Sequence, residues 1–398
     1  MTRILPAPTT FTVGYHDIYP DVSVNYQLNR FSDGSAQMVA EMRGVAACIH
    51  DYRDYVRELS ALSEQAFAHH RPLHGALYLR SAEFFMFPDD PAKQPARTRF
   101  ISTMRGVYGL TEDDVTHVPY ERSALPAYRF TPAKAQGTIV MFGGFDSYIE
   151  ELFAMAFYLV ERGYEVVLFE GPGQGGVLED ANIPMTPDWE RPVAAVLDHF
   201  ALSNVTLFGI SLGGCLALRA AAHEDRIARV VCDDILSDFQ AVVMRQLSPA
   251  IRNALRVLIA AHGARVVNAL IGAKQKRSLA VEWGVHQGMH VTGTSTPYDF
   301  LRETARYETA SASPLVTADV LLLAGSRDHY VPVEQLATQI SLLSAARTVT
   351  ARLFTEVEQA QNHIHVGNVG LSLDIVTDWL GQLAHATSRG RSRGGDCA

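Results

Sequence analysis

The spacing of apolar residues divides the chain into two parts. Over residues 37–69 the apolar positions recur at steps of three and four, which predicts helix. Similar spacing over residues 73–87 and 93–108 predicts further helices, whereas the first 35 residues, with three prolines, look irregular. Because these helices precede any parallel-strand pattern, we expect an N-terminal helical domain over residues 1–125.

After residue 117 the pattern changes to short apolar runs. Six of them predict strands buried on both faces, at residues 138–142, 165–169, 205–209, 229–232, 320–324 and 347–354. Helical segments lie between most of these runs, which is typical of a mostly parallel, doubly wound sheet covered by helices. We therefore predict an α/β fold.

The same pattern suggests how the rest of the chain is divided. The core of the predicted sheet comprises residues 126–239 and 313–386. Between these two parts, helical pattern replaces strands, which predicts a helical lid insertion over residues 240–312. The Arg- and Gly-rich end predicts a disordered tail over residues 387–398.

Composition and charge narrow the classes of function. The formal net charge is −9 and no basic run occurs before the extreme C-terminus, which argues against a nucleic-acid partner. No apolar stretch is long enough to span a bilayer, and residues 1–15 lack the pattern of a signal peptide. The four cysteines show neither metal-ligand spacing nor a disulfide framework. We expect a cytoplasmic protein that acts on a small molecule, with no membrane partner.

The strongest chemical signal is the segment Gly209–Gly213, whose sequence GISLG fits the pattern G-x-S-x-G. It follows a predicted strand and precedes a helical run, which is the context that an exposed nucleophilic serine requires. The glycines permit the tight turn, and the helix offers a backbone N–H to a developing oxyanion. A chance match in a turn of small residues is the alternative. The context favours Ser211 as the nucleophile and the Leu212 N–H as an oxyanion donor.

Two further groups are expected at the carboxyl ends of other strands. The strand at residues 138–142 leads through two glycines to Phe145, whose N–H we predict as the second oxyanion donor. An ordinary glycine turn is the alternative there. Asp328 lies in the loop after the strand at residues 320–324 and is the predicted acid of a catalytic triad.

Both the acid and the base have competitors. Asp233 and Asp234 follow another strand and compete with Asp328, and each of these carboxylates also has the alternative of a helix cap or turn. Asp328 is favoured because the chain order serine, acid, histidine then holds. The base follows the last strand, where His363 and His365 both qualify. The histidine that is not the base is then a surface or supporting residue.

No cofactor or metal is expected. Residues 171–176 match the dinucleotide pattern G-x-G-x-x-G after a strand, but residues 182–187 continue as a loop rather than a helix. We interpret this stretch as a glycine turn beside the active site. His262, His286 and His290 in the predicted lid lack the helical spacing of a zinc-binding pair.

Several segments together resemble one group of α/β-hydrolases. They are Phe169–Gly175 (FEGPGQG), Asp188–Glu190 (DWE), Gly209–Gly214, Asp328–Pro332 (DHYVP) and Asn362–Asn368 (NHIHVGN). The group contains bacterial 2,6-dihydroxypseudooxynicotine hydrolase, the fermentation-respiration switch protein and fungal polyketide-shortening (heptaketide) hydrolases. The resemblance covers roughly residues 70–385.

The resemblance implies an α/β-hydrolase fold with an N-terminal helical domain over the catalytic mouth. It implies His363 as the base, because the histidine before x-x-V-G-N has that role in the group. Cysteine and glutamine often come next in the group, where this chain has Ile364 and His365, so His365 is kept as an auxiliary candidate. An acidic residue near the oxyanion loop assists in one member, which indicates Asp146 here. A helix cap is the alternative role for Asp146.

These observations lead to one leading hypothesis. The chain is expected to be a serine hydrolase that forms an acyl-enzyme on an activated carbonyl compound. From the resemblance, carbon–carbon cleavage of a ketone or polyketide-like substrate ranks ahead of ester hydrolysis. An acyltransferase or cyclase, and a non-catalytic binding protein of the same fold, are the alternatives. The helical N-terminus and the lid are expected to wall a largely apolar pocket above Ser211. The oligomeric state stays open, with a homodimer considered.

Overall fold

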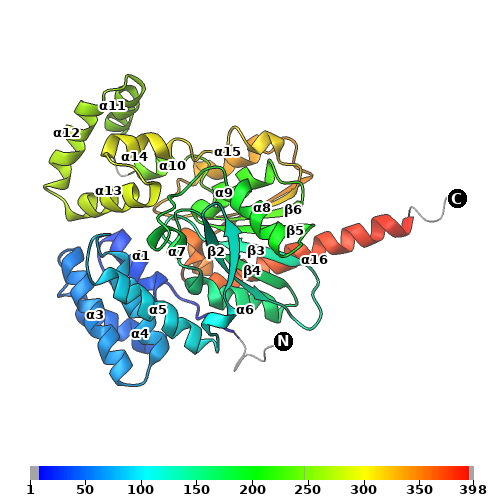
Figure 1. The fold of residues 1–398 in the computed structure, drawn as a ribbon, viewed down its shortest axis with the longest axis horizontal. Coiled ribbons are helices and arrows are strands. Elements are labelled where there is room, and N and C mark those ends of the chain that lie inside the picture. Colours follow the sequence, from blue (N-terminus) through cyan, green and yellow to red (C-terminus); the bar gives the residue numbers. More distant parts are fainter. Residues whose placement is uncertain (1–8, 246, 394–398) are drawn as a thin grey trace.

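A twisted sheet forms the centre of the molecule (Figure 1). The computed structural model describes residues 9–245 and 247–393, with side chains as far as residue 386. In this part of the chain the sheet has eight strands in the order β1-β2-β4-β3-β5-β6-β7-β8. The strands are β1 Thr116–Tyr120, β2 Ser123–Phe130, β3 Thr138–Phe142, β4 Glu165–Phe169, β5 Val205–Ile210, β6 Ile227–Asp233, β7 Asp319–Gly325 and β8 Thr348–Phe354.

Strands β3 to β8 run parallel, which confirms the predicted α/β fold with a mostly parallel sheet. Strands β1 and β2 form an antiparallel hairpin that adds to the edge of β4. The apolar-run criterion missed this hairpin because its residues are only partly buried, so no continuous apolar run marks it. The boundary expected after residue 125 therefore falls inside β2, and the sheet begins at Thr116.

Helices cover both faces of the sheet, as its doubly apolar strands require. One face packs against α7 Gly175–Glu179, α8 Glu190–His199, α9 Leu212–Ala221 and α15 Glu334–Leu342. The other face packs against α6 Phe153–Glu161 and α16 Val369–Arg393. Helix α16 projects from the body (Figure 1) and runs into the segment expected to be a disordered tail, of which residues 394–398 lie outside the described residues.

The N-terminal helices form a separate hydrophobic cluster. They are α1 Val22–Arg30, α2 Ala36–Ala46, α3 Tyr52–Ala68, α4 Pro72–Phe84 and α5 Lys93–Val107. The long stretch expected over residues 37–69 is two helices, because Asp51 caps the start of α3. Helix α1 lies in the segment expected to be irregular. It was missed because the helix is only nine residues long and buries Asn25, Gln27 and Asn29 beside its apolar residues Val24, Tyr26 and Leu28.

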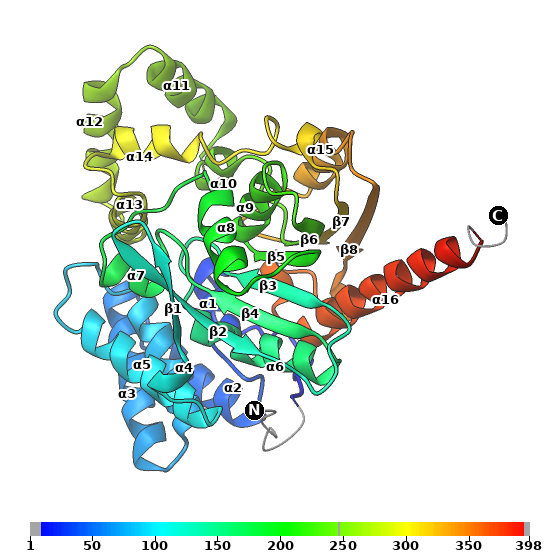
Figure 2. The same ribbon diagram turned by 45° about the vertical axis from the view of Figure 1, so that its right-hand side comes forward.

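The segment predicted as a lid is helical throughout most of its length. It comprises α10 Phe239–Val243, α11 Pro249–Ala260, α12 Ala264–Gln275, α13 Leu279–Thr292 and α14 Pro297–Thr304. Trp283 of α13 packs on Phe84 and Phe85 at the end of α4, with ring centroids 5.2 and 5.0 Å apart. The lid segment and the N-terminal helices therefore lie side by side (Figures 1 and 2).

Short 3-10 turns complete the described elements. They are η1 Glu112–Asp114, η2 Ile149–Leu152, η3 Ser313–Leu315, η4 Glu356–Glu358 and η5 His363–His365. Within the described ranges, none of the helices has the combined length and apolar character needed to cross a membrane.

Candidate active site

Ser211 lies at the sharp turn between β5 and α9. Its backbone adopts φ 60° and ψ −124°, a conformation that is strained for a residue with a side chain. The turn closes tightly, because a side chain at Gly209 would overlap the carbonyl group of Gly213. The chain therefore needs glycine on both sides of the serine, and the Ser211 side chain stays half-buried at the end of the strand.

His363 connects Ser211 to an acid. Its Nε2 atom lies 2.8 Å from Ser211 Oγ, and its Nδ1 atom lies 2.7 Å from Asp328 Oδ2. The other oxygen of Asp328 accepts hydrogen bonds from the N–H groups of Tyr330 (2.7 Å) and Val331 (2.9 Å). The loop after β7 thus holds the carboxylate in place. Serine, histidine and aspartate form the hydrogen-bonded line that activates a nucleophile.

The two competing acids lie next to different histidines. Asp234 Oδ2 is 2.9 Å from His363 Nδ1, so His363 contacts two carboxylates. Asp233 Oδ1 is 3.1 Å from Nε2 of His365, whose Nδ1 atom lies 3.0 Å from the Ala360 carbonyl oxygen. His365 is fully buried in this pair and has no contact with Ser211 among the described residues. The geometry favours His363 as the base and a structural role for His365.

Burial and charge set the protonation of these groups. Burial disfavours a charged imidazole, but the carboxylates of Asp328 and Asp234 outweigh it and raise the pKa of His363 above its ordinary value. Burial, together with the negative charge of Asp328, raises the pKa of Asp234 to about 6. Burial acts in the same direction on Asp328, but the His363 charge and hydrogen bonds prevail and lower its pKa to about 2.

The loop after β3 lies against the serine turn. A methyl group added to Gly144 would be 2.9 Å from both Ser211 Cβ and the Leu212 nitrogen, so a larger residue has no room. Gln174, from the FEGPGQG segment, fixes this loop by donating to the carbonyl oxygens of Gly143 (2.7 Å) and Gly144 (2.9 Å). The sequence placed this segment beside the site but did not identify Gln174 as its support.

Both predicted oxyanion donors lie in this region. Leu212 is the first residue of α9, so its N–H has no partner within the helix. Phe145 directly follows Gly144 in the loop that contacts the serine turn. Among the described residues, neither N–H donates a hydrogen bond to another group. Two free backbone donors beside a serine are the requirement for binding an oxyanion.

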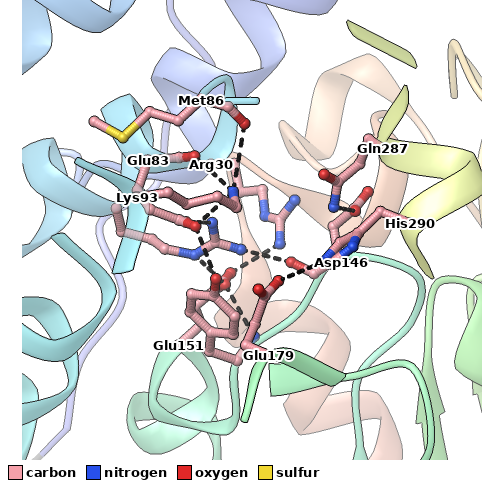
Figure 3. Close-up of polar contacts among 11 residues, drawn as sticks. Arg30, Glu83, Met86, Lys93, Asp146, Glu151, Glu179, Gln287 and His290 are labelled. Atoms are coloured by element: carbon pink, nitrogen blue, oxygen red, sulfur yellow. Dashed lines mark hydrogen bonds and ion pairs between the residues drawn. The ribbon is translucent and has the colours of Figure 1, made fainter. Parts of the chain in front are cut away.

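Asp146 lies next to this loop within a polar cluster (Figure 3). Its Oδ1 atom accepts a hydrogen bond from Gln287 Nε2 of α13 at 2.9 Å, and burial raises its pKa. Its backbone oxygen accepts from Arg80 of α4 at 2.5 Å. The residue that caps the following turn η2 is Tyr148. The helix-cap alternative for Asp146 is therefore wrong.

A small cavity beside Phe145 and Asp146 has a mixed polar and apolar lining. Charged and amide side chains line it together with apolar ones; the polar members are Arg80, Lys93, Asp146, Gln174, Glu179 and Gln287. Most of the charges are paired: Lys93 lies 2.7 Å from Glu83, and His290 lies 3.1 Å from Glu179 (Figure 3). Neither Ser211 nor His363 is among its lining residues, so the largely apolar pocket expected above Ser211 stays a prediction.

The N-terminal helix α1 covers the histidine. The ring of Tyr26 lies 6.0 Å from the ring of His363, and Gln27 donates to the hydroxyl of Tyr330 at 3.2 Å. From the lid segment, Arg245 donates to the backbone oxygen of Asp328 at 2.7 Å. These contacts place both helical parts around the site. Tyr26 belongs to no chemical motif, so no sequence signal marked it as part of the site.

Two overlapping groups of side chains have the donor types that bind divalent metal ions. They are Asp233, Asp234 and His365, and Asp234, Asp328 and His363, each with atoms within 4.8 Å of one another. In both groups an imidazole nitrogen already lies within hydrogen-bonding distance of a carboxylate. Within the described ranges, these side chains therefore contact one another as buried histidine–carboxylate pairs.

Comparison with known proteins agrees with this geometry. The family model described as "alpha/beta hydrolase fold" matches residues 139–352, which is more than half of the chain. The sequence is 33% identical over 264 residues to "Hydrolyase poxO" of Penicillium oxalicum, covering 59% of this chain and 62% of that protein. It is 31% identical over 280 residues to "20-hydroxy-prefusarin hydrolase FUS2" of Gibberella moniliformis, covering 63% of this chain and 66% of that protein. The chain thus spans less than two thirds of either relative.

A solved structure extends the likeness of fold. The crystal structure of 2,6-dihydroxy-pseudo-oxynicotine hydrolase superimposes with a TM-score of 0.57 at 20% identity, covering 90% of this chain and 92% of that one. At 20% sequence identity, this similarity is evidence for the fold alone. The resemblance inferred from the sequence segments to this hydrolase group is confirmed.

Proposed function

Because this chain belongs to the α/β-hydrolase fold family, we propose that it is a serine hydrolase that works through an acyl-enzyme. The observation that carries the proposal is the line of short contacts from Ser211 through His363 to Asp328. The relatives named as hydrolases support the same class of reaction.

In the proposed mechanism His363 removes the proton from Ser211 Oγ through Nε2. Asp328 keeps Nδ1 protonated and stabilises the imidazolium that forms. Ser211 then attacks a carbonyl carbon, and the N–H groups of Leu212 and Phe145 bind the oxyanion. When the tetrahedral intermediate collapses, the leaving group takes the proton from His363. Water, deprotonated by the same histidine, releases the acyl group.

We propose cleavage of a carbon–carbon bond next to a ketone as the first candidate reaction. A carbanion leaving group must be protonated as it departs, so an acid near the oxyanion loop assists it. Asp146 is suited to this role, because burial raises its pKa and Gln287 orients its carboxyl group. Carboxylic ester hydrolysis is the second candidate, since the Ser211 site by itself suffices for it.

We propose that the N-terminal helices and the lid segment cover the active site and form the wall that selects the substrate. Arg80 of α4 and Gln287 of α13 meet at Asp146, so N-terminal helices and lid segment line the same cavity. A substrate with hydroxyl or ketone groups fits such a polar wall, because its oxygens can replace hydrogen bonds to water. A cytoplasmic small-molecule hydrolase remains our proposal. The domain boundaries after residues 239 and 312 are also kept as proposals, whereas the N-terminal boundary moves to before Thr116, where the sheet begins.

Two assays test the proposed function. A fluorophosphonate probe is expected to label the purified chain at Ser211, which mass spectrometry of the labelled peptide identifies. Absence of labelling would favour a non-catalytic binding protein. Simple aryl esters and aromatic β-diketones are then compared as substrates for the native chain and for Asp146→Asn. Loss of diketone cleavage with retained ester turnover supports carbon–carbon cleavage.

Other results would favour the remaining candidates. Fast ester turnover without cleavage of any diketone would point to an esterase. Labelling of Ser211 without hydrolysis, but with product formation when an alcohol or amine acceptor is added, would favour an acyltransferase. An acyltransferase or cyclase has no specific support from the described contacts and is kept only as an outcome of this assay.

A further inference from the structure

Asp234 is a buried carboxylate that the proposed mechanism does not use. It follows β6, and its side chain is 1% exposed. Its Oδ2 atom lies 2.9 Å from His363 Nδ1, nearly as close as Asp328 Oδ2 at 2.7 Å. The same oxygen accepts the Ile364 N–H at 2.6 Å, which ties the carboxylate to the turn that carries the histidine.

The position of Asp234 differs from that of a carboxylate that only fills the core. The side chain of its neighbour Asp233 is equally buried but lies 3.1 Å from His365 Nε2, while the backbone oxygen of Asp233 accepts the Ser211 N–H at 2.5 Å. The Oδ1 atom of Asp234 and both side-chain oxygens of Asp233 have no hydrogen-bond partner within the described ranges. A buried carboxylate with one unpartnered oxygen is costly to retain, so its interactions through Oδ2 must compensate. Those interactions are with His363 and with the backbone next to it.

We propose that Asp234 is a second positioning residue for His363, and that Asp234 and Asp328 each suffice to hold Nδ1 protonated and Nε2 directed at Ser211. The inference rests on the proposed function of Ser211 and His363. In a site with a single acid, replacing that acid by asparagine permits the wrong imidazole tautomer and costs a factor of about 10⁴ in rate. Here the remaining carboxylate would still select the tautomer with a proton on Nδ1.

The charge of Asp234 also bears on the pH at which His363 works. Both carboxylates raise the pKa of this histidine, so removing one of them lowers it. His363 must be neutral to accept the serine proton, so the rate rises as pH increases through that pKa. Other titratable and charged groups also face this region from the packed elements; they are Tyr26, His329, Tyr330, Arg245 and His365.

The test uses three variants of the full chain and one control. Asp234→Asn keeps an oxygen that accepts the Ile364 N–H but removes the charge, so it separates the structural contact from the electrostatic one. It is compared with Asp328→Asn and with the double variant. Asp233→Asn is the control for a buried aspartate on the same strand that contacts the other histidine. Thermal unfolding followed by circular dichroism establishes that each variant is folded.

The first measurement is the second-order rate of fluorophosphonate labelling between pH 5 and 10. Each single variant is expected to lose about 10- to 100-fold, and the double variant about 10⁴-fold. The rising limb of the pH profile is expected to move to lower pH in Asp234→Asn and to stay in place in Asp233→Asn. A loss in Asp328→Asn as large as in the double variant, with an unmoved profile in Asp234→Asn, would overturn the inference.

The second measurement does not depend on catalysis. Protein labelled with ¹⁵N-histidine is examined by NMR for the downfield proton on His363 Nδ1. This resonance is expected in each single variant and is expected to disappear in the double variant. If the native chain is not labelled by the probe, the proposed function fails, while the resonance still decides whether both carboxylates hold the imidazole. Loss of this resonance in Asp328→Asn would show that Asp234 cannot hold the imidazole by itself.

Discussion

The Nε2 atom of His363 lies 2.8 Å from the Oγ atom of Ser211, although the two residues are 152 positions apart in the chain. Ser211 is carried by a strained turn after β5, and His363 by a short turn before α16. The parallel strands β3 to β8 bring both turns to the same edge of the sheet, because their carboxyl ends lie there. This contact is the basis of the first two predictions.

Ser211→Ala is expected to abolish labelling by the fluorophosphonate probe and to lower substrate turnover by a factor on the order of 10³ or more. The fold should persist, because alanine removes only a half-buried hydroxyl group. Labelling is followed by in-gel fluorescence, and folding by circular dichroism. Full labelling of the alanine variant would refute the assignment of the nucleophile.

Replacing His363 and replacing His365 by alanine are expected to affect labelling differently. His363→Ala removes the base and should lose labelling; because it also leaves the buried carboxylates of Asp234 and Asp328 without the imidazole, its free energy of unfolding should fall as well. His365→Ala leaves Asp233 buried without its partner, so the free energy of unfolding should fall by about 3–5 kcal/mol. Its folded fraction should still be labelled. Labelling rate and denaturant unfolding, measured on both variants, distinguish the roles; equal loss of labelling in both would contradict them.

Gly144→Ala is expected to impair the oxyanion site without unfolding the chain. The added methyl group would lie 2.9 Å from the Leu212 nitrogen, so the two loops must separate and the donors shift. Loss of one donor costs about 10²- to 10³-fold in kcat. Gly137→Ala is the matched control, because a methyl group there meets its nearest neighbour at 3.9 Å. A Gly144 variant as active as this control would exclude the proposed oxyanion site.

Glu83 forms buried ion pairs with Arg80 and Lys93, and from these pairs we expect the stability of the protein to depend on pH. Burial raises the pKa of Glu83, but the charges of Lys93 and Arg80 outweigh it and lower the pKa to about 2, from an ordinary value of 4.5. A depressed pKa means that the stabilisation is present above about pH 4.5 and is lost as pH falls toward 2. Glu83→Gln should therefore unfold more easily at neutral pH, with a weaker dependence over this range.

Denaturant unfolding at several pH values measures this effect for Glu83→Gln. Glu64→Gln is the control, because Glu64 pairs with Arg99 at an exposed site, where ion pairs contribute little. Equal pH dependence in the native chain and in Glu83→Gln would show that the cluster does not contribute to acid sensitivity.

The parallel strands and the serine turn could be predicted from the sequence alone. Strands such as β4 and β7 are buried on both faces, so their residues are continuously apolar and can be recognised locally. The turn at Ser211 has a local sequence pattern, although only part of its cause is local. A side chain at Gly209 would meet Gly213 of the same turn, whereas one at Gly213 would meet the Gly143 oxygen of the loop after β3. The hairpin β1–β2 escaped prediction because its residues are only partly buried, and helix α1 because it is short and buries amides beside its apolar residues.

Which acids contact which histidines depends on the three-dimensional fold. The sequence offered Asp233, Asp234 and Asp328 on two strands, and adjacent residues of one strand end differ little in local pattern. In the fold, the side chain of Asp233, the last residue of β6, reaches His365, whereas that of Asp234, in the loop that follows, reaches His363. The partner of Asp146 was equally hidden, because Gln287 lies 141 positions away. Such pairs depend on how helices pack over the sheet, and that packing is a property of the whole chain rather than of any segment.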